Sequence, residues 1–439
     1  MKKLVLIAVF FGLSASVTIA QNDDGVASSG SVYSQFGIGY PVEIANTAAN
    51  SMGISGVSYN ESFVGNLANP AHWGSTVYGL GTGGIELTSY QASNGVNSVR
   101  NTNFSINRFQ LQLPLVRGEF GASISFTPLT QSNFRTFQTT SRIIDKGAVQ
   151  DTLRYAIENY GKGGVNRAEI GFGWRINSNI SIGYAASVVY ISMDDVFTGT
   201  FFSEPSFRFL DPSYQQVHYT LETTGVSMGN RFGVQLRLPE LFTSDDLLGI
   251  GASISLPVSL DAEREETSST LGRSISVSDT PNLGSGTITL PMNILAGISY
   301  QPSRLVLIAT EGLYQGWSDY ENNFTSTESQ LFVDRYKLGL GFQYFPYIMG
   351  SDKFLSNFEY RFGVSYDTGH LQLEGERINT LMFSFGLGIL SPNVNSNSSI
   401  DLSFEYGIRG TESLVQEQIW GIRLSVNLAE LFFFRPKLQ

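Results

Sequence analysis

Apolar and polar residues alternate with a period of two along most of this chain. The pattern is clearest from residue 399 to residue 428, where one side carries large apolar residues and the other carries glycine, serine, asparagine and charges. The apolar set is Ile400, Leu402, Phe404, Tyr406 and Ile408, then Trp420, Ile422, Leu424, Val426 and Leu428. A period of two predicts strands with one apolar face. One such hairpin would also suit a soluble protein, so the interpretation depends on how often the pattern recurs.

The pattern recurs from residue 76 to the end of the chain and predicts about fourteen strands. They are expected near residues 76–91, 103–116, 118–138, 164–176, 179–192, 216–238, 247–264, 285–301, 303–319, 331–346, 356–370, 378–391, 397–409 and 416–432. Long connections near 92–102, 139–163 and 193–215 alternate with short turns at residues 117, 178 and 302. Segments of this length and spacing predict an all-β fold, a transmembrane antiparallel β-barrel in a bacterial outer membrane.

Charged residues occupy the polar side of several predicted strands. An Arg facing lipid at the bilayer midplane costs about 2 to 4 kcal/mol, so the strand register assigns the polar side to the lumen. The set is Lys337, Glu359, Arg361, Asp367, Asp401, Glu405, Arg409 and Arg423. We expect these groups to pair with each other and with a plug, because buried charges need partners. Binding of an anionic head group is the alternative.

The chain before the first strand divides into two parts. Residues 1–20 combine two lysines, an apolar run and small residues, which predicts a signal peptide cleaved before Gln21. Residues 21–75 lack strand alternation and are rich in Gly, Ser, Asn and Ala. Irregular backbone needs hydrogen-bond partners, and a polar lumen supplies them. We therefore expect an N-terminal plug, or hatch, over residues 21–75 and a barrel over residues 76–439.

Composition supports this assignment and excludes other classes. The chain has 46 Gly, 31 Phe and 20 Tyr, as expected for a barrel wall with aromatic girdles. It has no cysteine, which rules out disulfides and thiolate metal sites. The formal net charge of −11 argues against a nucleic-acid partner, which requires a basic surface. We expect no cofactor and no metal.

Two regions resemble the FadL-type family of long-chain fatty acid and hydrocarbon transporters. Gly53 and Gly56 precede Asn69, Pro70 and Ala71, which is similar to the small-residue run and Asn-Pro-Ala signature of that family. Further matches are Leu290, Pro291, Gly297, Tyr300, Pro302, Tyr314, Trp317, Tyr336, Leu338, Gly339, Gly386, Leu387 and Gly388. The chain departs from the family in a shorter third outer loop and in its end, where Phe432, Phe433 and Phe434 precede five further residues.

The resemblance implies a fourteen-stranded barrel that captures apolar molecules outside and releases them sideways into the membrane at a kinked third strand. Pro128 lies inside the predicted third strand, where it removes a ladder donor. It is the candidate for the kink, with an ordinary bend near the outer rim as the alternative. Asn69, Pro70 and Ala71 are the candidates for holding the hatch, and a simple turn before the first strand is their alternative.

One outer loop shows a helical period. In residues 151–161, Leu153, Ala156, Ile157 and Tyr160 fall on one helical face. This predicts a short amphipathic helix, with Leu153, Ile157 and Tyr160 as candidate cargo contacts. Inward packing as a lid is the alternative.

The predicted function is transport of hydrophobic compounds similar to long-chain fatty acids. Outer-membrane lipids and a small hydrophobic cargo are the expected partners. The alternative is a FadL-like barrel that serves as a structural or adaptor subunit, with protein partners in an outer-membrane secretion or assembly complex. Enzymatic activity is not expected, because His72, His218 and His370 stand at no spacing that suggests a catalytic triad.

Overall fold

The computed structural model describes residues 30–59, 61, 63–146, 149–270, 273–276, 284–324, 328–346, 354–393 and 396–430. The predicted signal peptide and the phenylalanines at 432–434 lie outside these residues. Among the described residues, no helix combines the length and the apolar content needed to span a membrane.

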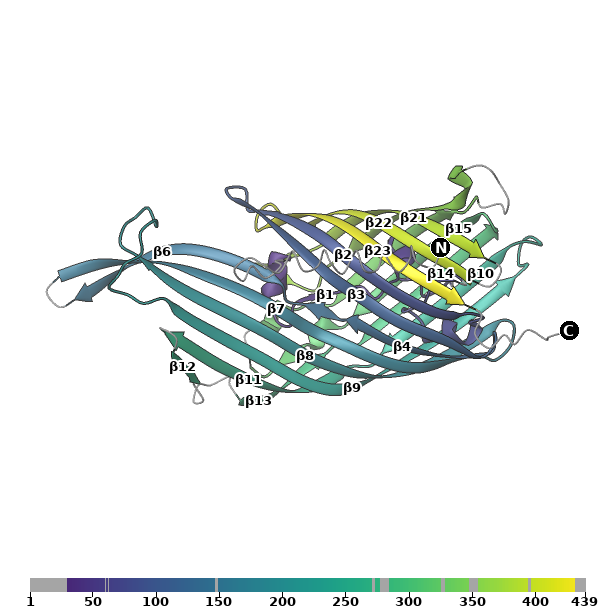
Figure 1. The fold of residues 1–439 in the computed structure, drawn as a ribbon, viewed down its shortest axis with the longest axis horizontal. Coiled ribbons are helices and arrows are strands. Elements are labelled where there is room, and N and C mark those ends of the chain that lie inside the picture. Colours follow the sequence, from purple (N-terminus) through teal and green to yellow (C-terminus); the bar gives the residue numbers. More distant parts are fainter. Residues whose placement is uncertain are drawn as a thin grey trace, which may run out of the picture.

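The described residues form a closed antiparallel barrel of fourteen wall strands, which confirms the predicted fold class (Figure 1). The wall consists of β2 (Gly79–Ser93), β3 (Ser98–Val116), β4 (Phe120–Pro128) with β6 (Phe134–Lys146), β7 (Val149–Arg175), β8 (Ile180–Phe202), β9 (Val217–Pro239), β10 (Leu247–Ser255) with β11 (Val258–Thr270), β13 (Gly284–Leu290) with β14 (Asn293–Ser303), β15 (Val306–Gln315), β17 (Arg335–Tyr344), β18 (Phe358–Asp367), β21 (Thr380–Asn393), β22 (Ser396–Gly410) and β23 (Gln416–Glu430). The barrel closes where β2 pairs with β23, from Gly79 opposite Glu430 to Ser93 opposite Gln416.

The remaining elements are short. They are the strands β1 (Tyr40–Pro41), β5 (Thr130–Gln131), β12 (Arg273–Ser276), β16 (Glu321–Asn322), β19 (Gln372–Leu373) and β20 (Glu376–Arg377), and the helices η1 (Val32–Gln35), α2 (Thr47–Asn50), η2 (Pro70–Ser75), η3 (Trp317–Asp319), η4 (Glu328–Leu331) and η5 (Phe354–Asn357). Side chains cap three of the helices, among them η1, where the Ser31 side chain accepts from the Tyr33 N–H. The Asn46 side chain accepts from the Ala49 N–H, and the Asn69 side chain accepts from the Ala71 N–H.

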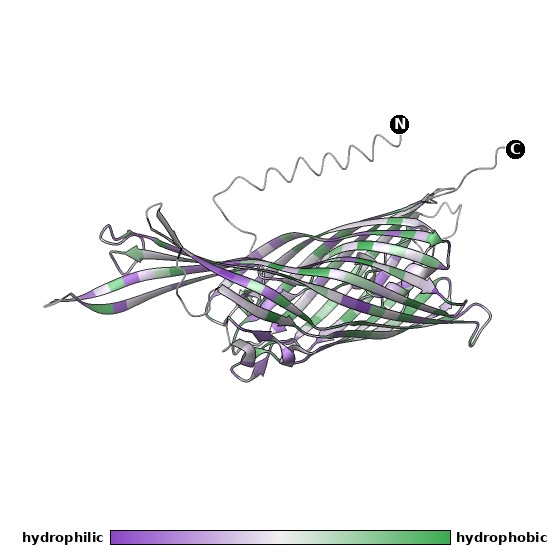
Figure 2. Ribbon diagram, turned by 90° about the horizontal axis from the view of Figure 1, so that it is seen from below, coloured by the Kyte–Doolittle hydropathy of each residue, from purple (hydrophilic) through white to green (hydrophobic). Residues whose placement is uncertain are grey.

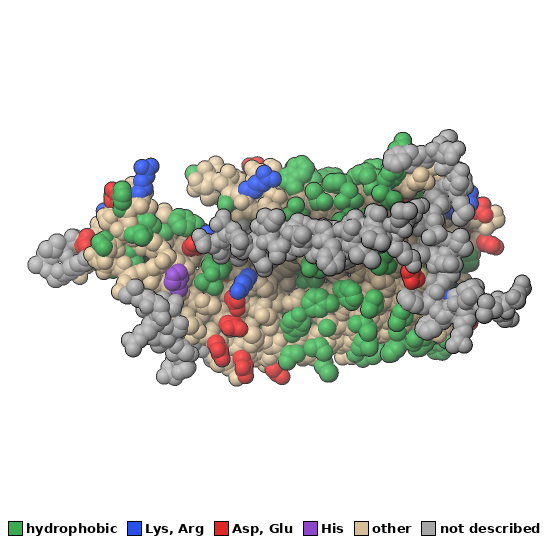
Figure 3. Space-filling model, viewed as in Figure 1, with side chains coloured by type: hydrophobic (Ala, Val, Ile, Leu, Met, Phe, Trp, Pro, Cys, Tyr) green, Lys and Arg blue, Asp and Glu red, His purple; other side chains and the backbone are tan. Residues whose placement is uncertain are grey.

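Alternate residues of each wall strand face opposite sides, as the sequence pattern predicts. On β8, Ala185, Val189 and Ile191 are buried, whereas Ile182 and Tyr184 are exposed. Figure 2 shows this alternation of apolar and polar residues along the strands of the barrel. Exposed apolar side chains gather in a belt around the barrel, as Figure 3 shows on one face; the belt includes Phe172, Trp174, Phe232, Ile308, Leu340, Phe362, Phe383, Phe404 and Ile422. A belt of this kind faces lipid.

The N-terminal segment, residues 30–75, contacts the inward-facing side of the wall. Wall glycines make room for its backbone: a Cβ added at Gly183 would lie 2.2 Å from the carbonyl carbon of Pro70, and one at Gly363 would lie 2.0 Å from that of Met52. Elsewhere Tyr33 and Ile38 of this segment join an apolar cluster with Trp317, Tyr320, Phe332, Leu371 and Ile378, which belong to the connections after β15 and β18.

Parts of five wall strands extend beyond the barrel as a projecting sheet, which we call the arm (Figure 1). It lies at the end opposite Glu430 and contains β6 with the neighbouring parts of β7, β8, β9 and β11. The predicted helix over residues 151–161 is wrong, because this segment is part of β7. Strand pairing with β6 on one edge and β8 on the other satisfies its backbone groups and overrides a short helical period.

Candidate functional site

The barrel wall is interrupted beside Pro128. The β3–β4 ladder ends at Phe109 opposite Phe126, and no described residue of β3 before Phe109 pairs with a strand on that side. The β4–β7 ladder ends at Pro128 opposite Asn166. Beyond this point the third wall strand keeps contact with β7 but separates from β3.

The N-terminal segment hydrogen-bonds to the separated edge in place of β3. Strand β1 pairs with β5, and the Val42 N–H donates to the Leu129 carbonyl at 2.8 Å. The Gly30 N–H donates to the Asn133 carbonyl at 2.6 Å. A sheet edge with unpaired backbone groups is unfavourable near lipid. These hydrogen bonds pair the backbone groups that have no partner on β3.

Amide side chains bridge the gap between β3 and this edge. The Asn133 Nδ2 donates to the Asn103 Oδ1 at 3.4 Å, and the Asn103 Nδ2 donates to the Gln131 Oε1 at 3.4 Å. The Asn101 Nδ2 donates to the Gly30 carbonyl at 3.1 Å. The gap is therefore closed at this level by long side-chain hydrogen bonds instead of a backbone ladder.

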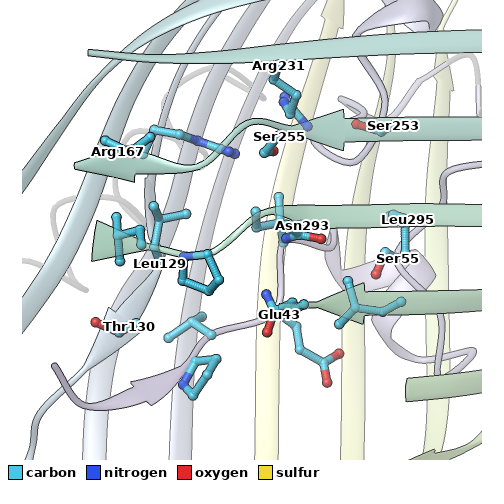
Figure 4. Close-up of a pocket in the computed structure, with 18 of the residues that line it drawn as sticks. Glu43, Ser55, Leu129, Thr130, Arg167, Arg231, Ser253, Ser255, Asn293 and Leu295 are labelled. Carbon is cyan, nitrogen blue, oxygen red and sulfur yellow. The ribbon is translucent and has the colours of Figure 1, made fainter. Parts of the chain in front are cut away.

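A cavity of about 110 Å³ lies behind the interruption (Figure 4). It is bounded by Leu129 and Thr130 of the third wall strand and by residues 41–44 of the N-terminal segment. Its apolar lining includes Val189, Leu256, Val258, Leu290, Leu295, Leu313 and Trp317. Its charged lining consists of Arg167, Arg231, Arg335, Lys337 and Glu43. The cavity is thus amphipathic, with four cationic groups and one carboxylate among apolar walls.

Three of the four cations are neutralised by protein groups. Arg231 contacts Glu169 and donates to the Leu67 carbonyl at 2.5 Å. Arg335 Nη2 lies 2.6 Å from an Asp367 carboxylate oxygen, and Lys337 Nζ lies 2.5 Å from Glu43. Figure 4 shows Glu43 on the side of the cavity opposite Arg167 and Arg231.

Arg167 is the cation with unused donors. Its side chain is 4% exposed, and its Nε and Nη2 atoms have no hydrogen-bond partner among the described residues. The nearest carboxylate oxygen, on Glu169, lies 3.6 Å from Nε, and Glu169 is already engaged by Arg231. Buried donors are normally satisfied, so Arg167 offers an anion two hydrogen bonds.

The lumen charges pair with one another and with the N-terminal segment, which confirms the expected pairing. Arg361 lies 2.7 Å from Asp401, contacts Glu359, and lies 3.2 Å from Glu61 of the segment. Arg423 lies 3.1 Å from Glu405 and 3.2 Å from Glu86. Arg409 lies 3.4 Å from Glu417, a residue missed by the sequence reasoning, whose carboxylate also accepts from Ser31 Oγ at 2.7 Å.

One wall carboxylate holds four consecutive backbone amides of the segment. The Glu311 oxygens on β15 accept from the N–H groups of Ser55 at 2.8 Å, Gly56 at 3.0 Å, Val57 at 2.7 Å and Ser58 at 3.3 Å. Glu311 is 4% exposed. A lone Glu on a polar strand face carries no sequence signal for this role, so Glu311 is not among the residues that the sequence predicts.

Asn69, Pro70 and Ala71 lie at the contact between the segment and the wall. The Asn69 Nδ2 donates to the Val234 carbonyl of β9 at 2.9 Å and to the Val57 carbonyl at 3.0 Å. Its Oδ1 accepts from the Ala71 N–H at 3.0 Å. The three residues are fully buried. One side chain thus links two parts of the segment to a wall strand.

Leu153, Ile157 and Tyr160 do not form one surface. In β7, Leu153 and Ile157 share a face, whereas Tyr160 points to the opposite face, because strand side chains alternate. All three lie in the arm, away from the cavity. The predicted common contact surface is therefore wrong, for the same reason as the predicted helix.

The three histidines lie in separate environments. His72 Nε2 lies 3.1 Å from the Val57 carbonyl, and burial lowers the pKa of His72 to about 4. His218 Nδ1 lies 3.1 Å from Thr198 Oγ1 in the arm. His370 stacks with Trp317, at 4.8 Å between ring centroids, and with Tyr40 at 5.0 Å.

A closed barrel with an apolar outer belt and a charged interior defines an integral β-barrel protein of the bacterial outer membrane. The family model described as BamG matches residues 1–439, and the chain belongs to the BamG family. No curated protein matches the chain.

The fold is shared with solved FadL-type channels, as the sequence resemblance implied. A Pseudomonas aeruginosa FadL homologue matches with a TM-score of 0.56 and 13% identity over 90% of this chain and 99% of that one. The Ralstonia pickettii toluene transporter TbuX matches with a TM-score of 0.54 and 14% identity over 88% and 99%. The Pseudomonas putida toluene transporter TodX matches with a TM-score of 0.51 and 14% identity over 90% and 99%.

Proposed function

We propose that the protein transports hydrophobic compounds with an acidic head group, of the long-chain fatty acid kind, across the outer membrane. The cargo binds in the cavity with its carboxylate at Arg167 and its alkyl chain along the apolar lining. It leaves sideways through the gap between β3 and the third wall strand, with Pro128 at the start of that gap. Residues 30–75 act as the hatch, held by Asn69, Pro70 and Ala71.

The observation that carries the proposal is the adjacency of the cavity and the wall interruption. Leu129 and Thr130 line the cavity and directly follow Pro128, where the ladder ends. The lumen beyond the cavity carries paired charges, which an alkyl chain would have to desolvate. A lateral exit avoids that cost. Two structural neighbours, TbuX and TodX, are toluene transporters, which are proteins with apolar cargo.

A disulfide across the gap tests the proposal in a chain that has no cysteine of its own. Asn103→Cys with Asn133→Cys would join β3 to the separated edge, where the two side chains now hydrogen-bond. Uptake of radiolabelled oleate would be measured in a host outer membrane deprived of its own fatty acid transporter. We expect uptake that stops on oxidation and returns on reduction.

The matched control is Phe109→Cys with Phe126→Cys, which joins β3 to β4 at the last paired position of the ladder. Oxidation of this control should leave uptake unchanged. Equal uptake by the oxidised and reduced forms of the gap variant would refute a lateral exit at Pro128.

The second candidate function is an adaptor subunit of an outer-membrane assembly or secretion complex. The arm favours it, because β6 and the projecting parts of its neighbouring strands extend beyond the barrel and contribute no residue to the cavity lining. Native mass spectrometry of gently extracted protein separates the two functions. Bound acyl lipids support transport, and protein partners in fixed ratio support the adaptor.

A further inference from the structure

Strand β6 pairs with a neighbour on one edge only. Its partner is β7, and along residues 134–145 no described strand pairs with the opposite edge. The flanking bonds show which residues point to that free edge. The Ser132 N–H donates to Gly163 toward β7, whereas the Asn133 carbonyl points away and accepts from Gly30. Antiparallel geometry therefore directs the backbone groups of the odd-numbered residues 135–145 to the free edge.

The lower end of this same edge already binds extended backbone. Strand β1 pairs with β5, and Gly30 donates to Asn133, both on the side away from β7. These contacts stop at residue 133. The edge thus continues upward for about ten residues, or roughly 33 Å, in a conformation that accepts a strand.

The middle of the free edge, between Arg135 and Arg142, carries no charge, proline or glycine that would oppose pairing. Residues 134–145 contain neither proline nor glycine, and Phe137 and Ile143 are 67% and 66% exposed on one face. Edge strands of soluble regions are normally blunted by charges, prolines or bulges. Large exposed apolar side chains on an unprotected edge mark an interaction site.

This part of β6 lies beyond the lipid-facing belt. Arg135 forms an ion pair with Glu158 at 2.5 Å, and Lys162 pairs with Asp194 at 3.0 Å. Exposed charges of this kind belong in water, and Figure 3 shows acidic side chains between the apolar belt and the arm. Lipid therefore does not cover Phe137 and Ile143.

We propose that the free edge of β6 binds an extended segment of another protein, which joins the arm as an added antiparallel strand. Only a polypeptide backbone supplies donors and acceptors at the spacing of the odd-numbered residues. Apolar residues at alternate positions of the segment cover Phe137 and Ile143, and polar or acidic residues lie beside Arg142 on the other face. The edge lies outside the cavity, so this proposal is independent of the cargo proposal.

A backbone-specific pair of substitutions tests the proposal on the full chain. Thr139→Pro removes an N–H that points to the free edge, whereas Thr139→Val keeps it and keeps strand propensity. The probe is a fluorescent synthetic peptide with the sequence of residues 151–161, which pair with the other edge of β6 within the chain. Binding is measured by fluorescence anisotropy, with a scrambled peptide as control and heat-modifiable migration on gels as the check of barrel folding.

We expect the unchanged chain and Thr139→Val to bind the peptide equally and Thr139→Pro to bind at least about tenfold more weakly. Amide exchange in residues 135–145 should slow when the peptide is added. Equal binding by both variants, no binding at all, or amides already protected without peptide would overturn the proposal. Dimers of the chain that exclude the peptide and disappear in Thr139→Pro would also overturn it. The free edge of β6 would then bind a second copy of this chain instead of another protein.

Discussion

Glu311→Ala should release the N-terminal segment from the wall while leaving the barrel intact. The substitution removes the acceptor of four amides, those of residues 55–58. A hydrogen bond to a charged group contributes about 1.5 to 3 kcal/mol, and bonds that share one acceptor are not additive. We therefore expect a loss of about 4 kcal/mol of local stability, which is roughly a thousandfold shift in the opening equilibrium.

Amide hydrogen exchange of residues 55–58 is the direct assay. Exchange should speed up in Glu311→Ala, whereas amides in β22 and β23 should keep their protection. Glu311→Gln is the graded control, because its single carbonyl oxygen retains part of the acceptor capacity and should give an intermediate rate. Unchanged protection of residues 55–58 in Glu311→Ala would refute the assignment of Glu311 as the anchor.

Three further perturbations test other contacts. Burial raises the pKa of Glu61 to about 8, above its ordinary value of 4.5, so its stabilising effect is complete below pH 4.5 and is lost as the pH rises through 8; the thermal midpoint should therefore fall between pH 4.5 and pH 8 and level off at higher pH, and Glu61→Gln should flatten that dependence. Gly183→Val would drive a side chain into Pro70, whereas Gly83→Val meets no atom within 4 Å; proteolysis of residues 30–75 should accelerate in the first variant alone. Arg167→Gln should weaken oleate binding about tenfold by calorimetry, through loss of one charge-assisted bond, with the exposed Lys162→Gln as a neutral control.

The period-two pattern of apolar residues correctly predicts most of the fold. The register that places Arg361 and Asp401 inside follows from a period of two and the cost of charge in lipid, and both residues lie in the lumen as expected. The lengths of the strands in the arm could not be predicted from this pattern. The apolar residues 153, 156, 157 and 160 do not alternate regularly with polar ones, and they fit a helical period as well as a strand, which led to the wrong prediction of a helix in part of β7.

The candidate site was less accessible to sequence reasoning than the fold. Pro128 was visible as a proline inside a strand, a local signal with a local cause. Arg167 and Glu311 stand at ordinary polar positions, and their environment depends on a segment more than a hundred residues away. No local pattern encodes such a contact. Glu61 was likewise not identified from the sequence, because its partner Arg361 lies 300 residues further along the chain.

The placement of residues 30–75 also constrains the order of assembly. Ser31 bonds to Glu417, 386 positions later, and the barrel closes only when β23 meets β2. The N-terminal segment therefore cannot form its contacts with β23 until that strand has been synthesised. Contacts between residues so far apart in the sequence slow folding. The open sheet has to surround this segment before β2 pairs with β23 and closes the barrel.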